Sequence, residues 1–206
     1  MEIYFVRHGE TVWNTQKRFQ GLSDSPLTEK GIEQAKLLSK KLENINFDKF
    51  YSSPLKRAND TAKLIRGNRN QEIEIFDDFK EISMGEMEGI QHEEFKKIYP
   101  QQQNDFYFDP VNYNPKIYGG ESFLEVRERV INGLEKFINL NKDYERVLVV
   151  SHGATLKTLF HYLKGTELNE LKEEKVPKNT SYTVVKYENK KFEIIDFSNI
   201  SHLESI

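Results

Sequence analysis

Short apolar runs alternate along the chain with longer segments in which apolar residues recur at helical spacing. Four runs have the length and composition of buried strands: 2–6 (EIYFV), 48–52 (DKFYS), 72–76 (EIEIF) and 146–150 (RVLVV). Helical spacing occurs over 28–45, 53–67, 122–137 and 153–163. Strands that alternate with helices predict an α/β fold, a three-layer sandwich with a mostly parallel central sheet flanked by helices. Two further runs, 181–187 and 192–197, flank the turn-like pair Asn189-Lys190 and predict a closing hairpin or paired strands.

The predicted helices carry residues that commonly begin or end a helix. Thr28 is a candidate N-cap, and Ser53 followed by Pro54 has the order of an N-cap and a first helical residue. Ser122 and Glu125 fit the S-x-x-E capping box. Two glycines are placed to end helices: Gly67 and Gly165.

Residues 83–120 interrupt the alternation of strands and helices. They contain a short predicted helix over about 91–99 and several phenylalanines and tyrosines between 106 and 118. We expect an insertion within a single domain that spans residues 1–206, packed over the carboxyl ends of the strands. The aromatic side chains could simply anchor a loop, or the segment could be a lid or the wall of a substrate pocket. The second interpretation is favoured because long irregular segments in compact domains are usually functional.

The composition argues against several classes of protein. The chain of 206 residues has a net charge of −3, so no basic field indicates a nucleic acid or an anionic membrane as a partner. It has no cysteine, which excludes disulfides, thiolate metal sites and a cysteine nucleophile. No apolar run reaches the roughly 20 residues of a membrane-spanning helix, and the first residues lack the pattern of a signal peptide. We therefore expect a cytoplasmic protein; no pattern in the sequence indicates an oligomeric state.

Polar residues follow each of the four predicted strands. They form four clusters: Arg7-His8-Gly9-Glu10, Ser53-Pro54-Leu55-Lys56-Arg57, Asp78-Phe79-Lys80-Glu81 and Ser151-His152-Gly153. Ligands of open α/β sheets bind beyond the carboxyl ends of the strands, so these clusters should converge on one site.

The side chains in these clusters suit phosphoryl transfer. Guanidinium groups pair with phosphate oxygens and keep their charge at any working pH. A neutral imidazole is a nucleophile towards phosphorus, and a protonated imidazole stabilises charge on the transferring group. A carboxyl group can donate a proton to the leaving oxygen and later accept one from water. A glycine after each histidine leaves room for backbone N–H groups to approach the anion.

Other interpretations of the histidines must be weighed. A histidine at a strand end is commonly a plain polar residue. Metal binding is a further alternative, but the chain has no His-x-His, no H-E-x-x-H and no carboxylate cluster at ligand spacing. The remaining histidines have no motif around them. We expect His161 at a helix surface or the edge of the core, and His92 and His202 exposed.

Five stretches of the chain resemble, in the same order, those of the histidine phosphatase superfamily, which contains the cofactor-dependent phosphoglycerate mutases. They are VRHGETVWNTQKRFQGLSDSPLTEKGIEQA, YSSPLKRANDTA, FKEISMGEMEG, GGES and VVSHGA. The resemblance extends from residue 3 to about residue 185, nearly the whole chain. Motifs that recur in a fixed order are far more specific than a lone Arg-His-Gly tripeptide.

The resemblance implies roles for particular residues and requires no metal. His8 would be the nucleophile that becomes phosphohistidine, and Glu81 would donate a proton and then activate water. The rest of the phosphate pocket would be formed by Arg7, Arg57 and His152. Contacts to phosphate or substrate are implied for Asn14, Gln20, Gly21 and Gly153, the last through its backbone. Glu121 and Ser122 would border the pocket, although a capping role explains Ser122 as well.

The residues after Glu81 favour the phosphatase branch of this family. The mutases have an Arg-His-Tyr stretch there and a longer basic insertion, whereas this chain has Gly85-Glu86-Met87-Glu88-Gly89, with Met87 where the branch commonly has tryptophan. Few cations of the insertion could clamp a second phosphate: Lys96, Lys97 and Lys116. We therefore expect a metal-independent hydrolase of a small phosphorylated metabolite. A phosphoglycerate mutase and a non-catalytic phospho-ligand-binding module are the alternatives.

Overall fold

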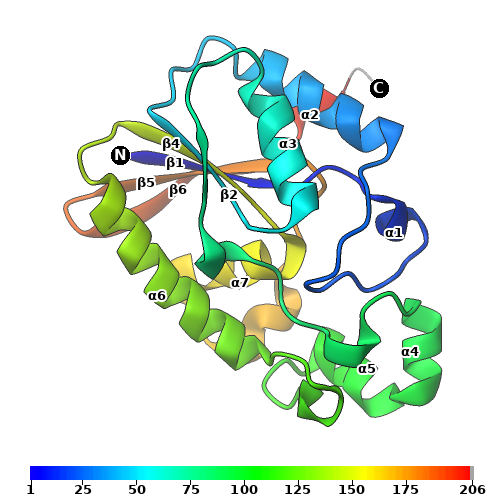
Figure 1. The fold of residues 1–206 in the computed structure, drawn as a ribbon. Coiled ribbons are helices and arrows are strands. Elements are labelled where there is room, and N and C mark those ends of the chain that lie inside the picture. The colour runs from blue at the N-terminus through cyan, green and yellow to red at the C-terminus, as the bar shows by residue number, and fades with distance from the viewer. Residues whose placement is uncertain (205–206) are drawn as a thin grey trace.

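A computed structural model describes residues 1–204, and its centre is a six-stranded sheet in the order β3-β2-β4-β1-β5-β6 (Figure 1). The strands are β1 (Glu2–Arg7), β2 (Lys49–Ser52), β3 (Ile73–Ile75), β4 (Arg146–Ser151), β5 (Tyr182–Glu188) and β6 (Lys191–Asn199). The first four are parallel, β5 is antiparallel to β1, and β6 is antiparallel to β5. The mostly parallel sheet is thus confirmed. So is the closing hairpin, in which Asn189 and Lys190 both have positive φ, as a tight two-residue turn requires.

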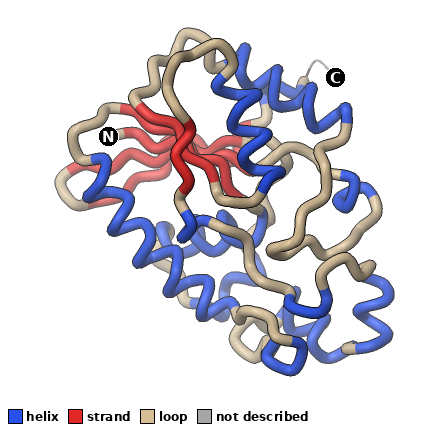
Figure 2. Tube along the Cα trace, viewed as in Figure 1, coloured by secondary structure: helices blue, strands red, loops and turns tan. Residues whose placement is uncertain are grey.

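Helices cover both faces of the sheet (Figure 2). The long ones are α2 (Glu29–Lys41), α3 (Lys56–Arg66), α6 (Phe123–Asn141) and α7 (Gly153–Leu163). Side chains alternate along β1, so that Tyr4 and Val6 pack in the apolar cluster of α2 and α3, whereas Ile3 and Phe5 pack in that of α6 and α7. The predicted three layers are therefore confirmed.

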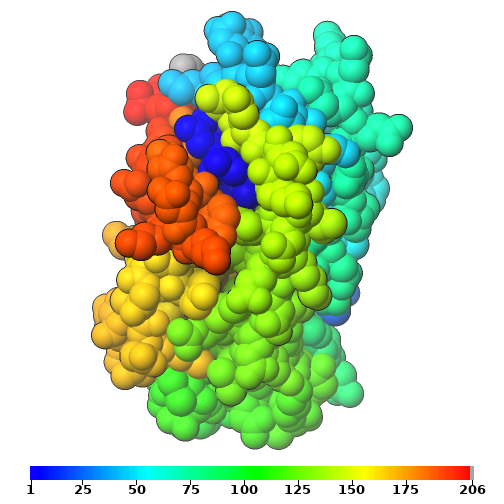
Figure 3. Space-filling model, turned by 90° about the vertical axis from the view of Figure 1, so that its left-hand side faces the viewer, coloured from blue at the N-terminus to red at the C-terminus, as the bar shows by residue number. Residues whose placement is uncertain are grey.

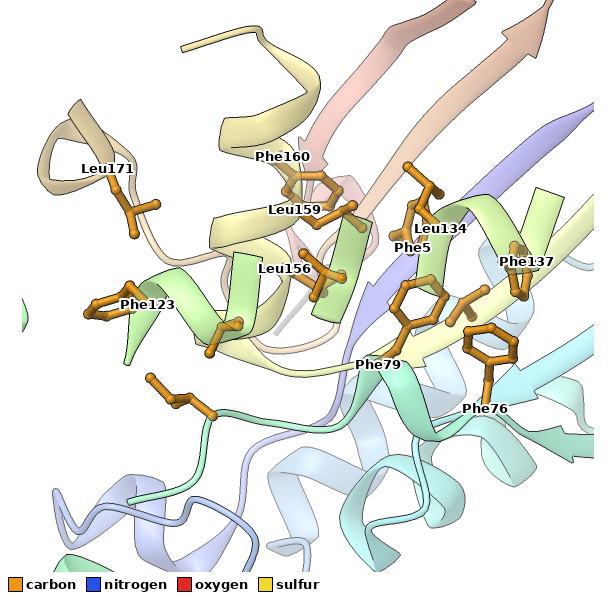
Figure 4. Packing of buried hydrophobic residues seen from close by; sticks show 14 of the residues in the cluster. Phe5, Phe76, Phe79, Phe123, Leu134, Phe137, Leu156, Leu159, Phe160 and Leu171 are labelled. Atoms are coloured by element: carbon orange, nitrogen blue, oxygen red, sulfur yellow. The ribbon is translucent and has the colours of Figure 1, made fainter. Parts of the chain in front are cut away.

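The apolar cluster on the α6 and α7 side is rich in aromatic rings (Figure 4). The ring centroid of Phe79 lies 5.8 Å from that of Phe5, 4.9 Å from Phe76 and 5.6 Å from Phe137. Such packed aromatic pairs contribute beyond the apolar area that they bury. Since Phe79 precedes Glu81 by two residues, this packing fixes the loop that carries Glu81.

Most predicted helix ends are confirmed. The hydroxyl of Thr28 accepts a hydrogen bond from Gly31 N at 3.0 Å, and Ser122 with Glu125 forms the capping box of α6. Gly67 ends α3 with φ of 58°. α2 ends at Lys41, four residues before the predicted end at residue 45, because the chain turns at Leu42.

The predicted start of α3 was wrong. The helix begins at Lys56, not directly after Ser53, because a distant loop caps it. Asp24 Oδ2 accepts a hydrogen bond from Lys56 N at 2.7 Å, and Asp24 Oδ1 accepts one from Arg57 N at 3.2 Å. This cap frees the hydroxyl of Ser53 for a contact in the site described below.

The insertion, residues 83–120, contains two helices, α4 (His92–Ile98) and α5 (Pro100–Phe108). α5 was not predicted, because its glutamines and scattered aromatic residues form no apolar stripe. Pro100 begins α5, where a proline is tolerated. Figure 1 places both helices beside α1 (Val12–Thr15), and the insertion forms the lower end of the molecule in Figure 3. Within residues 1–204, none of the helices has both the length and the apolar character required to span a bilayer.

Candidate active site

A cavity of about 280 Å³ opens where the parallel strands end. Its lining includes most of the residues that the sequence singled out: Arg7, His8, Asn14, Gln20, Gly21, Arg57, Glu81 and Gly153. His152 lies next to this lining, with its ring centroid 5.3 Å from that of His8. The structure thus brings together side chains from four strand ends and from the loop after α1.

His8 is held as a neutral imidazole with one free nitrogen. The ring is 2% exposed, and Nδ1–H donates to Gly9 O at 2.8 Å, so the lone pair is on Nε2. Burial, reinforced by the charges of Arg57 and Arg7, keeps the pKa of His8 well below its usual value of 6.5. His8 is therefore unprotonated at neutral pH, the state in which an imidazole can attack phosphorus.

Gly9 serves packing rather than anion binding. Its N–H donates to Thr61 Oγ1 at 3.0 Å, so it is not available to a ligand. A Cβ at this position would lie 2.6 Å from Gly31 O. The glycine therefore lets the end of β1 meet the first turn of α2, and its own N–H is used within the protein.

Two buried arginines border the cavity, each with a donor that is still free. Arg57 is 1% exposed; its Nη1 donates to Ser23 O at 2.7 Å and its Nη2 to Gly21 O at 2.8 Å. Arg7 Nη1 donates to Pro177 O at 2.7 Å. Within residues 1–204, Nε of both arginines is buried without a hydrogen-bond partner. Buried polar groups rarely stay unpaired, so these N–H groups are suited to hold an anion.

His152 is fully buried beside His8. Its Nε2 lies 2.6 Å from Ser53 Oγ, and its Nδ1 has no partner among the described residues. Burial and the charge of Arg57 lower the pKa of His152 well below 6.5, so the ring is neutral at pH 7. When the Ser53 hydroxyl donates to Nε2, Nδ1–H is left to donate to a phosphoryl oxygen.

Glu81 is anchored at the N-terminus of α7. Its Oε2 accepts a hydrogen bond from Ala154 N at 3.2 Å, and its Oε1 accepts one from Thr155 N at 3.0 Å. These N–H groups belong to the first turn of α7, which has no intrahelical acceptors for them. The carboxylate is thereby fixed at the cavity wall.

Arg129 of α6 supports the loop before Glu81 from outside the cavity. Its Nη1 donates to Lys80 O at 3.0 Å, and its Nη2 donates to Glu121 Oε2 at 2.8 Å. This ion pair holds Glu121 against Arg129, and Ser122 is used as the cap of α6. Neither residue is in the lining of the cavity, and of the two explanations of Ser122 the capping role is the one that is confirmed.

Asn14 and Gln20 present amide nitrogens to the cavity. Asn14 Oδ1 accepts hydrogen bonds from Thr11 N at 3.1 Å and from Asn179 Nδ2 at 3.3 Å, and Gln20 Oε1 accepts one from Thr11 Oγ1 at 3.0 Å. Because the oxygens are used within the protein, the NH₂ groups are the ends that remain for a ligand. Both side chains can therefore donate to an anion.

Glu88 ties the insertion to the loop around Gly21. Its Oε1 accepts hydrogen bonds from Leu22 N at 2.8 Å and Met84 N at 3.2 Å, and its Oε2 accepts from Ser23 N at 2.8 Å and Ser23 Oγ at 2.6 Å. The same loop offers its carbonyls to Arg57. Glu88 thus positions Arg57 without touching the cavity, a role that the sequence did not reveal.

Some histidines are more buried than the sequence predicted, and several residues that line the cavity were not predicted. His92 and His202 were expected to be exposed, but His92 lines the cavity with its ring 4.2 Å from Phe19, and His202 is buried with its Nε2 3.1 Å from Thr180 Oγ1. His161 is buried on α7. The insertion contributes a wall, as one interpretation expected, through His92, Phe106 and Tyr107. The nearby Trp13, Lys17, Arg18 and Phe19 also line the cavity; their spacing from Asn14 and Gln20 was the signal that could have identified them.

The mostly parallel sheet, with this cluster of arginines, histidines and a glutamate at its strand ends, defines an α/β protein with a site suited to bind a phosphoryl group. The chain belongs to the histidine phosphatase superfamily (branch 1), whose family model matches residues 3–200. It is 33% identical over 201 residues to the "Uncharacterized phosphatase PhoE" of Bacillus subtilis, covering 98% of this chain and 96% of that one. It is 36% identical over 208 residues to the "Metal-independent phosphoserine phosphatase" of Arabidopsis thaliana, covering 100% and 84%.

The solved structure titled "Bacillus stearothermophilus YhfR" has the same fold. Its TM-score is 0.94 at 35% sequence identity, and the match covers 98% of this chain and 99% of that chain. Other relatives are named as phosphoglycerate mutase-like proteins. The predicted family is therefore confirmed, and relatives named as phosphatases support a phosphatase activity.

Proposed function

We propose that the protein hydrolyses phosphomonoesters of small metabolites through a phosphohistidine at His8. The observation that carries the proposal is the state of His8: a buried, neutral imidazole whose free Nε2 shares a cavity with Arg7, Arg57 and Glu81. An imidazole held in this tautomer between two cations suits nucleophilic attack on a bound phosphate.

The first step transfers the phosphoryl group to the enzyme. Arg7, Arg57 and His152 hold the phosphate oxygens and stabilise the charge of the transition state. His8 Nε2 forms a bond to phosphorus while the bond from phosphorus to the ester oxygen breaks. A protonated Glu81 gives its proton to that oxygen, and the alcohol leaves.

The second step returns the enzyme to its starting state. Glu81, now a carboxylate, takes a proton from water as the water oxygen bonds to phosphorus and the bond from phosphorus to Nε2 breaks. Inorganic phosphate leaves, and His8 is again neutral. The steps use only groups of the protein; within residues 1–204, no group of three or more histidine, aspartate and glutamate side chains is arranged to hold a metal ion.

The test uses p-nitrophenyl phosphate without added metal. His8→Ala should lose turnover, because the neighbouring ring of His152 has its Nε2 bound to Ser53 and cannot replace the nucleophile. Glu81→Gln should release one equivalent of p-nitrophenol in a burst and then slow, because this leaving group needs no proton whereas the attacking water needs a base. Full turnover by His8→Ala would refute the proposal.

A phosphoglycerate mutase is the second candidate, because Lys17 and Arg18 add positive charge to the cavity. The sequence favoured a phosphatase over a mutase because the insertion has few cations that could hold a second phosphate. Lys17 and Arg18 lie outside the insertion and weaken that reasoning. A mutase converts 3-phosphoglycerate in a manner that depends on 2,3-bisphosphoglycerate. Release of inorganic phosphate as the main product, with or without that cofactor, would favour the phosphatase.

A further inference from the structure

Two cations line the cavity on the side of the insertion. Lys17 and Arg18 follow α1, and both are joined to the insertion by hydrogen bonds: Lys17 O accepts from His92 N at 2.9 Å, and Arg18 Nη1 donates to Gly89 O at 2.6 Å. The arginines that face His8 come instead from β1 and α3. The cavity therefore has a second cationic group that the phosphoryl-transfer steps do not use.

No carboxylate of the described residues neutralises this second group. In that part of the chain Glu81 is the only acidic residue in the lining of the cavity, and it is held by the first turn of α7. Within residues 1–204, neither Lys17 nor Arg18 forms an ion pair within 4 Å. Arg18 Nε donates to the neutral Gln16 Oε1 at 2.8 Å, which leaves its charge uncompensated.

The backbone at Lys17 is fixed in an unfavourable conformation. Its φ is 53°, in the left-handed region that side chains other than glycine seldom adopt. The conformation is held on both sides, because Lys17 N donates to Asn14 O at 3.2 Å and Arg18 N donates to Trp13 O at 3.0 Å. This pair of hydrogen bonds is the left-handed termination of α1, and it fixes the direction in which the chain carries Lys17 and Arg18 along the cavity wall.

Neutral groups complete this end of the cavity. The ring of His92 packs at a tilt against that of Phe19, and burial together with the charge of Lys17 lowers the pKa of His92 below 6.5. Tyr107 Oη lies 3.4 Å from His92 Nδ1, which leaves Nε2 as the remaining ring donor. Phe106 and Trp13 supply apolar wall for a carbon skeleton. A ligand anion here would meet two cations and a neutral donor; the carboxylate of Glu93 acts on His92 from outside the cavity lining.

We infer that Lys17 and Arg18 form a subsite for a second anionic group, so that the preferred substrate is a small phosphomonoester whose leaving group carries a carboxylate or another phosphate. The inference rests on the proposed function, since it describes the leaving-group side of the same cavity. His8 takes the phosphoryl group, and the second anion orients the ester for that attack.

The test is a series of ω-phosphooxy carboxylates with two to six carbons, each compared with the alkyl phosphate of equal length. In the wild type, kcat/KM should favour the carboxylate by about tenfold at one chain length, which corresponds to about 1.4 kcal/mol and lies between a charge pair at about 4 Å in water and one near a protein surface. Comparing kcat/KM for propane-1,3-diol bisphosphate with that for the monophosphate tests a second phosphate in the same way. The pair of esters with the larger ratio of kcat/KM values shows whether the subsite prefers a carboxylate or a phosphate.

Lys17→Met removes the charge and keeps the length of the side chain. It should abolish most of this preference by raising KM for the charged esters, with a smaller change in their kcat and in KM for the alkyl phosphates. Lys36→Met is the control, because Lys36 is an exposed lysine of α2 outside the cavity. Equal kcat/KM for charged and uncharged esters at every length, with p-nitrophenyl phosphate still hydrolysed, would overturn the subsite alone. Loss of all hydrolysis in the wild type would overturn the proposed function itself.

Discussion

Glu88 offers a sharp test of how the phosphate-binding residues are positioned. In Glu88→Gln, one side-chain oxygen remains, so at best two of the four hydrogen bonds from Leu22, Ser23 and Met84 survive. The new NH₂ group cannot accept a hydrogen bond, so it leaves at least one backbone N–H of this loop without its acceptor. The loop that holds Arg57 through Gly21 O and Ser23 O should loosen.

The magnitude follows from the hydrogen bonds that the substitution removes. A hydrogen bond to a charged group contributes about 1.5–3 kcal/mol, and water can replace part of it because Glu88 is only half-buried. We expect the free energy of unfolding to fall by about 2–4 kcal/mol. If about 1.4 kcal/mol of this destabilisation reaches the anion site, vanadate binds about tenfold more weakly.

The assay combines urea unfolding with inhibition of p-nitrophenyl phosphate hydrolysis by vanadate. Glu86→Gln is the matched control, since Glu86 is exposed and its side chain forms no hydrogen bond within residues 1–204. The reasoning is refuted if Glu88→Gln binds vanadate as the wild type does and unfolds within about 0.5 kcal/mol of it.

Three further predictions concern stability at low pH, a substitution at Gly21 and a substitution of a core phenylalanine. His8 and His152 have lowered pKa values in the folded protein, so the unfolded chain binds their protons first as pH falls below about 6.5. Stability should then decrease towards pH 5, by up to about 1.4 kcal/mol per pH unit for each histidine, and unfolding curves that coincide at pH 7 and pH 5 would contradict this. Gly21→Ala should raise KM, because Gly21 has φ of 54° and a Cβ there would lie 2.2 Å from Glu88 Oε1. Gly119→Ala is the control: Gly119 also has positive φ, but a Cβ there would meet open space, so KM should stay unchanged. Phe137→Ala, at a fully buried position, should cost about 3–5 kcal/mol by chemical denaturation, whereas Leu140→Ala at an exposed position of the same helix should cost little.

Local patterns in the sequence were enough to predict the layers of the fold. Continuous apolar runs located β1 and β4, because these strands bury both faces, one in each apolar cluster; helical spacing located α6 and α7, because each buries one face. The convergence of Arg7, His8, Arg57, Glu81 and His152 followed from one rule, that parallel strands present their carboxyl ends at a single edge. A helix without an apolar stripe, such as α5, had no comparable signal.

Contacts between distant loops could not be predicted in this way. Glu88 and Ser23 are 65 residues apart, and Asp24 caps a helix that begins 32 residues later. No periodicity encodes such pairs, since each depends on where two irregular segments meet in space. The positions of Lys17 and His92 in the cavity depend on the same meeting of the loop after α1 with the insertion.

The most direct test of the account is ³¹P NMR of Glu81→Gln, denatured at alkaline pH after mixing with p-nitrophenyl phosphate. Because Nδ1–H of His8 is bound to Gly9 O, the account predicts one phosphoramidate per chain, at Nε2 of His8. Peptide mapping should place the phosphoryl group at residue 8, and the double variant with His8→Ala should give no such signal. Hydrolysis without any phosphoramidate, or a phosphoryl group on His152, would contradict the central claim.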